Sequence, residues 1–118
     1  MAAAGRQRDL RRALMSLLDS AMTETIRWGL IGAGGIAGAF ARDLRLLPDH
    51  QVLAIGSRAQ ATADAFADEH AVERRYASYA DLVADPDIDA VYVATPHPGH
   101  HDAAMLAIEA GKAVLVEK

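Results

Sequence analysis

The 118-residue sequence contains no cysteine, which excludes disulfide bonds, thiolate metal sites and cysteine nucleophiles. It also lacks any apolar run near the roughly 20 residues that a membrane-spanning helix needs, so we expect no membrane contact. Basic tracts are missing as well. Twelve Lys and Arg oppose sixteen Asp and Glu, and the net charge of −4 argues against nucleic acid as a partner. Together these absences predict a cytoplasmic protein.

The overall composition is that of a folded domain. Hydrophobic residues make up 52% and charged residues 24% of the chain, far from the low hydropathy and high charge of disordered chains. A length of 118 residues is sufficient for one modest core. We therefore expect one folded unit over residues 25–118, preceded by a weakly structured extension over residues 1–24.

The extension differs from the sequence that follows it. It carries arginines and a leucine stripe at helical spacing, namely Arg6, Arg8, Arg11 and Arg12 with Leu10, Leu14, Leu17 and Leu18. The acidic residues Asp9 and Asp19 and the lack of a long apolar core argue against a targeting signal. Two interpretations remain: a frayed or weakly helical addition, or a translation start at Met22, where MTETIRWGLIG makes a compact domain start.

From residue 25 onward, short β-type runs alternate with helical patterns. Strands are predicted over residues 26–31, 51–57, 88–96 and 113–118, and helices over residues 35–47, 59–70, 79–85 and 100–110. Ser78 is placed to cap the brief third helix, and Gly111 to end the last one. The alternation predicts an α/β fold, a Rossmann-type doubly wound parallel sheet that binds ligands at the carboxyl ends of its strands.

Glycines crowd the junction between the first strand and the first helix, where the sequence reads GAGGIA. Gly32, Gly34 and Ala37 have the G-x-G-x-x-A spacing of dinucleotide-binding turns. Gly32 permits a tight turn, Gly34 leaves room for a diphosphate, and Ala37 lets the helix lie close to the strand. The amides of Gly35 and Ile36 then point toward the phosphate oxygens. The alternatives are a tight turn without a ligand and the glycine loop of a methyltransferase.

An acidic residue is missing at the end of the second strand, where an NAD-preferring site holds the ribose hydroxyls with one. Ser57 and Arg58 stand there instead. They suit the 2′-phosphate of NADP, because arginine offers a planar fork to phosphate oxygens. NADP is therefore the predicted cofactor, with NAD as the alternative. In the competing interpretation, Ser57 only caps the following helix and Arg58 is a solvated residue of its first turn.

Two further blocks, SYADLVADPDIDAVYVATP and AGKAVLVEK, follow the glycine turn in order. With them, residues 25–118 resemble the N-terminal half of the glucose-fructose oxidoreductase, inositol dehydrogenase and rhizopine-catabolism (Gfo/Idh/MocA) family. The stretch HPGHHDAAMLAIEAGKAVL, taken with Ser57 and Arg58, most resembles the NADP-using dihydrodiol and D-xylose dehydrogenase branch. The resemblance implies a longer, two-domain enzyme, of which this chain is an incomplete N-terminal domain without the C-terminal substrate domain.

The resemblance also implies roles for residues at the ends of the last two strands. It assigns proton transfer to Lys118, places Thr95, Pro96, His97 and Glu117 along the cofactor, and turns His100 toward the substrate. The alternatives are structural: exposed strand-end side chains for Lys118 and Glu117, and a helix-capping histidine for His100. We expect no metal at the nearby histidines, because neither cysteine nor a settled ligand spacing accompanies them.

For the whole enzyme, the resemblance implies hydride transfer between NADP and the hydroxyl-bearing carbon of a sugar or diol, in a homo-oligomer. The 118-residue chain alone is expected to be inactive. The alternative function is a truncated, non-catalytic module that binds NADP(H).

Overall fold

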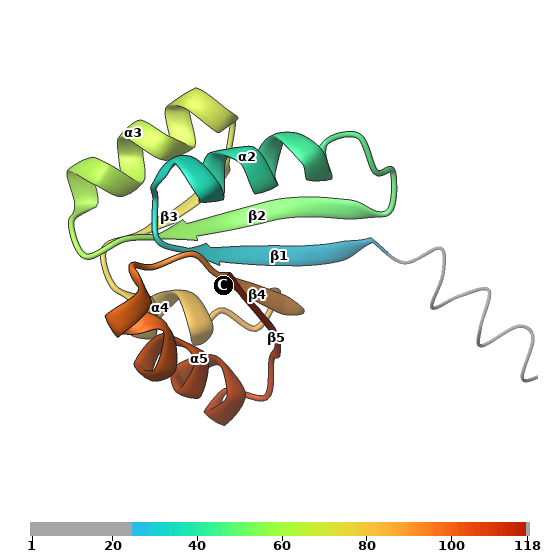
Figure 1. The fold of residues 1–118 in the computed structure, drawn as a ribbon. Coiled ribbons are helices and arrows are strands. Elements are labelled where there is room, and N and C mark those ends of the chain that lie inside the picture. The colour runs from blue at the N-terminus through green and yellow to red at the C-terminus, as the bar shows by residue number, and fades with distance from the viewer. Residues whose placement is uncertain (1–24, 118) are drawn as a thin grey trace, which may run out of the picture.

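The computed structural model describes residues 25–117, so the expectations for the extension and for Lys118 lie outside the described residues. Strands and helices alternate along the chain (Figure 1). In order they are β1 (Ile26–Ile31), α2 (Gly35–Leu44), β2 (His50–Gly56), α3 (Gln60–His70), β3 (Arg74–Tyr76), α4 (Tyr79–Val83), β4 (Ala90–Val93), the 3₁₀ turn η1 (His97–Gly99), α5 (His100–Glu109) and β5 (Ala113–Val116).

The five strands form one parallel sheet in the order β3-β2-β1-β4-β5. The predicted Rossmann-type α/β fold is therefore confirmed. The chain leaves β1 toward β2 and β3 on one side and returns to β4 and β5 on the other. The resulting switch between β1 and β4 is where open α/β sheets bind ligands, at the carboxyl ends of the strands.

Helices cover both faces of the sheet, with α2 and α3 on one side and α4 and α5 on the other (Figure 1). Neighbouring residues of β1 show the division: Leu30 packs in the cluster beneath α2 and α3, and Ile31 packs in the cluster beneath α4 and α5. Both are fully buried. A strand buried on both faces explains why this segment reads as a continuous apolar run.

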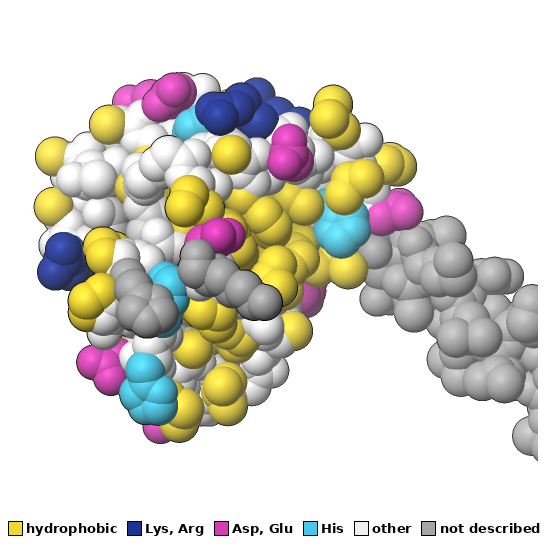
Figure 2. Space-filling model, in the orientation of Figure 1, with side chains coloured by type: hydrophobic (Ala, Val, Ile, Leu, Met, Phe, Trp, Pro, Cys, Tyr) yellow, Lys and Arg dark blue, Asp and Glu magenta, His cyan; other side chains and the backbone are white. Residues whose placement is uncertain are grey.

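The edge strand β5 is less well covered than the centre of the sheet. Leu115 is 48% exposed and Val116 is 39% exposed. Figure 2 shows hydrophobic side chains gathered over the region where Figure 1 places β1, β4 and β5. Within residues 25–117, no helix is long and apolar enough to cross a membrane.

Several boundaries differ from the sequence predictions. The strand β3 was not predicted, and β4 is shorter than the expected 88–96. The helix α2 ends at Leu44 rather than at residue 47, because its last turn tightens: the Leu46 amide bonds the Asp43 carbonyl, three residues back (3.1 Å).

Two predictions about the ends of helices are confirmed. Ser78 Oγ caps α4 by accepting from the Asp81 amide (3.1 Å), and Gly111 follows α5 with φ at +78°.

A buried carboxylate fastens β3 to the segment before β4. The Asp85 side chain is 1% exposed and accepts hydrogen bonds from Arg74 Nη1 (2.8 Å), Tyr76 Oη (2.7 Å) and the Asp87 amide (2.9 Å). Burial raises the pKa of Asp85, but the hydrogen bonds from Arg74 and Tyr76 outweigh it and lower the pKa to about 2. Lys112 Nζ donates to the Asp85 carbonyl (2.7 Å), which also ties in the turn before β5.

The depressed pKa of Asp85 predicts an acid-sensitive contribution to stability. Because the folded pKa lies below the ordinary 3.8, the contribution is complete above that value and is lost as pH falls through about 2. It amounts to about 2 kcal/mol near neutral pH. In urea unfolding, the free energy of unfolding of Asp85→Asn is expected to be lower than that of wild type by at least about 2 kcal/mol at about pH 7, and this difference is expected to narrow at about pH 3. Asp43→Asn, at an exposed position, is the control; an Asp85→Asn deficit that stays constant with pH contradicts the prediction.

Candidate functional site

The turn between β1 and α2 has the backbone that the glycine spacing predicts. Gly32 adopts φ +99°, and a Cβ there would lie 2.9 Å from the Ala94 carbonyl oxygen, so no other residue fits without strain. The Gly32 amide donates to the Gly56 carbonyl (2.9 Å), which joins the turn to the end of β2. A Cβ on Gly34 or Gly35 would meet no atom within 4 Å. These two glycines therefore keep the space in front of the turn open.

The N-terminus of α2 has no side-chain cap. Gly34 is the N-cap residue, and the first intrahelical bond joins the Gly38 amide to its carbonyl (3.1 Å). The amides of Gly35, Ile36 and Ala37 consequently have no partner within the helix, and no acidic residue lies in the first turn. Ala37 is fully buried against the sheet, as predicted. Such a helix end attracts an anion through its amides and its dipole.

A groove of ≈ 490 Å³ opens in front of this turn. It is lined at the carboxyl ends of β1, β2 and β4 by Gly32, Ala33, Gly34, Gly35, Ile36, Ser57, Arg58, Thr62, Tyr79, Ala94, Thr95 and Pro96. A smaller pocket of ≈ 180 Å³ adjoins it and shares Arg58, Tyr79, Thr95 and Pro96. The groove has the size of a small-molecule site, and it lies at the topological switch point.

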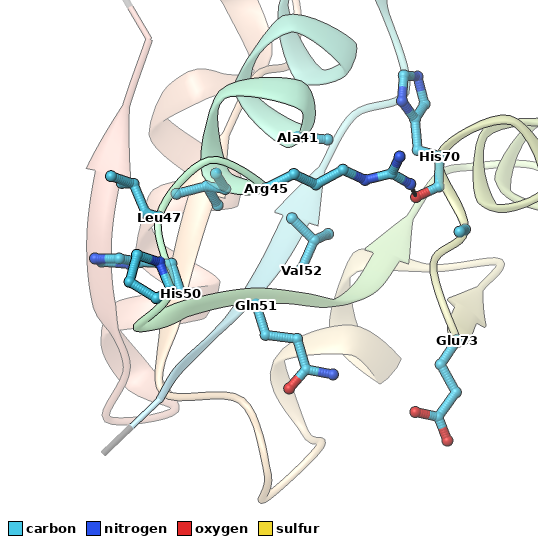
Figure 3. Close-up of a pocket in the computed structure, with 11 residues that line it drawn as sticks. Ala41, Arg45, Leu47, His50, Gln51, Val52, His70 and Glu73 are labelled. Carbon is cyan, nitrogen blue, oxygen red and sulfur yellow. Dashed lines mark hydrogen bonds between the residues drawn. The ribbon is translucent and has the colours of Figure 1, made fainter. Parts of the chain in front are cut away.

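A second cavity of ≈ 490 Å³ lies at the other edge of the sheet, among the ends of α2 and α3 and the start of β2 (Figure 3). Two of its polar side chains are used by the protein itself. Arg45 Nη2 donates to the His70 carbonyl, as Figure 3 shows, and His50 Nδ1 accepts from Trp28 Nε1 (3.0 Å). This cavity lies away from the glycine turn and from the topological switch point, so the glycine groove is the candidate site.

Ser57 and Arg58 both line the groove, and their role toward a 2′-phosphate stays a prediction. The competing interpretation of Ser57 as the cap of α3 is wrong, because Ala59 is the N-cap residue and makes no side-chain bond. Ser57 is 9% exposed, yet within residues 25–117 its hydroxyl makes no hydrogen bond. Arg58 likewise has no acidic partner in the described part of the chain, in contrast to Arg74, which pairs with Asp85. Both side chains remain available to a ligand.

Thr95 contributes a hydroxyl to the floor of the groove. Thr95 is 6% exposed, and its Oγ1 is buried with no hydrogen-bond partner among the described residues. Leaving a buried hydroxyl unsatisfied costs about 1–3 kcal/mol. A ligand with a polar group at this place would remove that cost. Pro96 is exposed beside it and lines both the groove and the smaller pocket.

The histidines of the next loop are placed differently. His100, the first residue of α5, lies with Nε2 2.6 Å from the Thr95 carbonyl, so Nε2 donates and fastens the loop. This contact supports the structural interpretation of His100, and its role toward a substrate stays a prediction. Of His97 the structure gives only its place in η1. No group of three or more His, Asp or Glu side chains within residues 25–117 is arranged to hold a metal ion.

Glu117 is held at the end of β5 by a residue that sequence reasoning missed. The Tyr92 hydroxyl donates to Glu117 Oε2, and the Glu117 amide bonds the Val93 carbonyl (3.0 Å). Burial raises the pKa of Tyr92, with a further rise from the Glu117 carboxylate, to about 12. Phe40 stacks on the Tyr92 ring with a centroid distance of 3.9 Å. Glu117 is thus a positioned carboxylate at the end of β5, and it is not among the residues that line the groove. The only sequence signal for its contact with Tyr92 was one hydroxyl in the apolar run AVYVA.

Comparison with known proteins agrees with the fold. Residues 26–118 match the family model GFO_IDH_MocA, described as an oxidoreductase family with an NAD-binding Rossmann fold. Over 95 residues the chain is 44% identical to the trans-1,2-dihydrobenzene-1,2-diol dehydrogenase of Bos taurus and 42% identical to that of Homo sapiens. Each match covers 79% of this chain and 28% of the relative. The chain therefore spans less than a third of the length of these relatives.

Solved structures with similar folds include two cofactor complexes. The chain resembles KijD10, a 3-ketoreductase from Actinomadura kijaniata in complex with NADP, at a TM-score of 0.75 and 36% identity, covering 80% of this chain and 30% of that one. It resembles myo-inositol dehydrogenase from Lactobacillus casei in complex with NAD(H) and myo-inositol at a TM-score of 0.74 and 26% identity, covering 80% and 28%.

The buried Thr95 hydroxyl predicts a substitution that does not destabilise. Thr95→Val replaces an unsatisfied hydroxyl by a methyl group of similar size, so the free energy of unfolding is expected to stay unchanged or to rise by about 1 kcal/mol. The reverse exchange at Val93, which is 0% exposed, is the control: Val93→Thr is expected to lose about 1–3 kcal/mol. Urea unfolding measures both. A Thr95→Val loss as large as that of Val93→Thr would mean that the hydroxyl is satisfied in the free protein.

Proposed function

The chain belongs to the Gfo/Idh/MocA oxidoreductase family, and we propose that its residues 25–118 are the cofactor-binding half of an NADP-dependent dehydrogenase of sugars or diols. The observation that carries the proposal is the groove at the switch point. It joins the uncapped N-terminus of α2 to Ser57, Arg58 and the unsatisfied Thr95 hydroxyl. Each of these groups lacks a partner in the described chain, and each suits a part of a phosphorylated dinucleotide.

The choice of NADP over NAD is supported by charge. None of the residues that line the groove is acidic, whereas Arg58 is cationic and unpaired within residues 25–117. An acidic side chain at the end of β2 would accept from the ribose hydroxyls of NAD and repel a 2′-phosphate. Because Arg58 and Ser57 stand there, the proposal assigns them to the 2′-phosphate.

The residues of this chain hold and orient the cofactor. The amides of Gly35 and Ile36 bind the diphosphate at the α2 dipole, and the open space before Gly34 admits it. Thr95 and Pro96 line the path from β1 toward β4. When bound, NADP supplies the hydride acceptor of the reaction. Lys118 lies outside the described residues and follows Glu117, whose carboxylate accepts from the Tyr92 hydroxyl. The proposal assigns to Lys118 the transfer of the proton from the substrate hydroxyl.

The substrate class is the part of the proposal that reaches furthest. It is supported by relatives whose names specify a dihydrodiol and by a structural neighbour bound to myo-inositol. Vicinal hydroxyls are common to both. We therefore assign a small polyhydroxylated substrate to the whole enzyme. The proposal also gives the whole enzyme a second domain and a homo-oligomeric state. A chain that binds the cofactor without turning over any diol or sugar would instead fit the non-catalytic module.

Cofactor binding is tested by titrating the 118-residue chain against NADPH and NADH and following nicotinamide fluorescence. Arg58→Ala is expected to weaken the binding of NADPH about tenfold and that of NADH less than about twofold, because the substitution removes a charge-assisted contact to the 2′-phosphate. Arg42→Ala, in the last turn of α2, makes the same charge change away from the groove and is expected to alter neither. Equal losses for the two cofactors in Arg58→Ala would contradict the 2′-phosphate assignment, and no binding of either by wild type would contradict the proposed function.

A further inference from the structure

The ring of Tyr92 and its hydroxyl have different surroundings. Tyr92 is 5% exposed, and its ring packs in the cluster beneath α2 and α3, where Phe40 stacks on it. A phenylalanine would fill this apolar layer without bringing in a polar group. The hydroxyl instead donates to Oε2 of Glu117, 25 residues further along the chain. Because a buried hydroxyl is costly unless it has a partner, apolar packing alone does not explain the tyrosine.

Glu117 uses only part of its hydrogen-bonding capacity. Its amide bonds the Val93 carbonyl (3.0 Å), and its Oε2 accepts from Tyr92. Within residues 25–117, Oε1 accepts no hydrogen bond and the carboxylate forms no ion pair. An ionised carboxylate has about four acceptor positions on its two oxygens. The side chain is therefore anchored at one oxygen and open to a donor at the other.

The pair of Tyr76 and Asp85 is a contrasting case in the same chain. The Asp85 side chain is 1% exposed, and both of its oxygens accept from Arg74 Nη1 (2.9 and 2.8 Å). That carboxylate is engaged within the protein, which agrees with a structural role. Glu117 is partly exposed and keeps one oxygen free among the described residues. The bond from Tyr92 therefore fixes a carboxylate that can still bind another molecule.

Glu117 lies one strand beyond the glycine groove. The groove follows the carboxyl ends of β2, β1 and β4, and β5 is the next strand of the sheet. Val93, whose carbonyl accepts from the Glu117 amide, directly precedes the groove residues Ala94 and Thr95. A dinucleotide carries one nucleoside on each side of its diphosphate. In the proposed function the diphosphate lies at α2 and the 2′-phosphate at the end of β2, so the nicotinamide riboside extends toward β4 and β5.

We propose that Tyr92 is a positioning residue for the nicotinamide half of the cofactor. Its hydroxyl holds Glu117 so that the free carboxylate oxygen accepts from the hydroxyls of the nicotinamide ribose. Tyr92 itself contacts no part of the cofactor and acts only through Glu117. The stacking of Phe40 on Tyr92 also ties this carboxylate to α2, the helix that holds the diphosphate. The inference rests on the proposed function and deepens it, because it concerns the half of the cofactor that carries the hydride.

The test removes only the hydroxyl. Tyr92→Phe keeps the ring that stacks on Phe40 and is expected to weaken the binding of NADPH about fivefold, because Glu117 loses its orientation. The binding of 2′,5′-ADP, which has no nicotinamide ribose, is expected to change less than about twofold. Nicotinamide fluorescence measures the first and calorimetry the second, both on the 118-residue chain. An unchanged ratio of the two affinities in Tyr92→Phe overturns the inference.

A double-mutant cycle shows whether Tyr92 acts through the carboxylate. Glu117→Ala is expected to weaken NADPH binding at least as much as Tyr92→Phe does. Adding Tyr92→Phe to Glu117→Ala is then expected to weaken NADPH binding no further, because the hydroxyl has lost the group that it positions. A further loss in the double variant overturns the inference.

Tyr76→Phe is the matched control, because it also removes a hydroxyl that donates to a carboxylate. Its free energy of unfolding is expected to fall, but its ratio of NADPH to 2′,5′-ADP affinity is expected to stay that of wild type. A ratio that falls as far as in Tyr92→Phe would mean that lost stability explains both variants, and it overturns the inference. Wild type that binds neither NADPH nor 2′,5′-ADP overturns the proposed function itself, which is a distinguishable result.

Discussion

Backbone amides without partners at the starts of α2 and α3 are the feature on which the candidate site depends. A helix begins with amides that its own hydrogen bonds cannot satisfy, and a side-chain cap normally supplies an acceptor. Gly34 and Ala59 supply none, whereas Ser78 caps α4 in the same chain. The two uncapped helices follow β1 and β2, so their free amides meet at one edge of the sheet. That edge has room and donors for phosphate oxygens.

The rest of the fold keeps these two helix ends in place. Gly32 bonds the Gly56 carbonyl and so ties the α2 turn to the end of β2. The Ser57 amide bonds the Tyr76 carbonyl at the end of β3, and Asp85 in turn accepts from Tyr76 and Arg74. A buried carboxylate that does not line the groove therefore supports the strand ends that carry it. Tyr92 does the same for Glu117 across β4 and β5.

The sequence was sufficient for the features that depend on local pattern. Apolar runs located the central strands, and the glycine spacing predicted the backbone at Gly32 because only glycine adopts that conformation readily. It was insufficient where the partner is distant. The strand β3 has no apolar alternation; it pairs with β2, and its Arg74 bonds Asp85, 11 residues on. The bond between Tyr92 and Glu117 joins residues 25 apart. The uncapped state of α3 also required the backbone, because Ser57 precedes the helix closely enough to suggest a cap.

The central claim is that the free amides of α2 hold the diphosphate of a nicotinamide cofactor. The most direct measurement is an amide-resolved NMR titration of the ¹⁵N-labelled chain with NADPH. The account predicts saturable shifts that centre on Gly35 and Ile36, with no comparable change at Gln51 or Glu73 in the cavity on the opposite edge of the sheet. Shifts centred on that opposite cavity, or none at the glycine turn at a concentration of NADPH that saturates the chain, would contradict it.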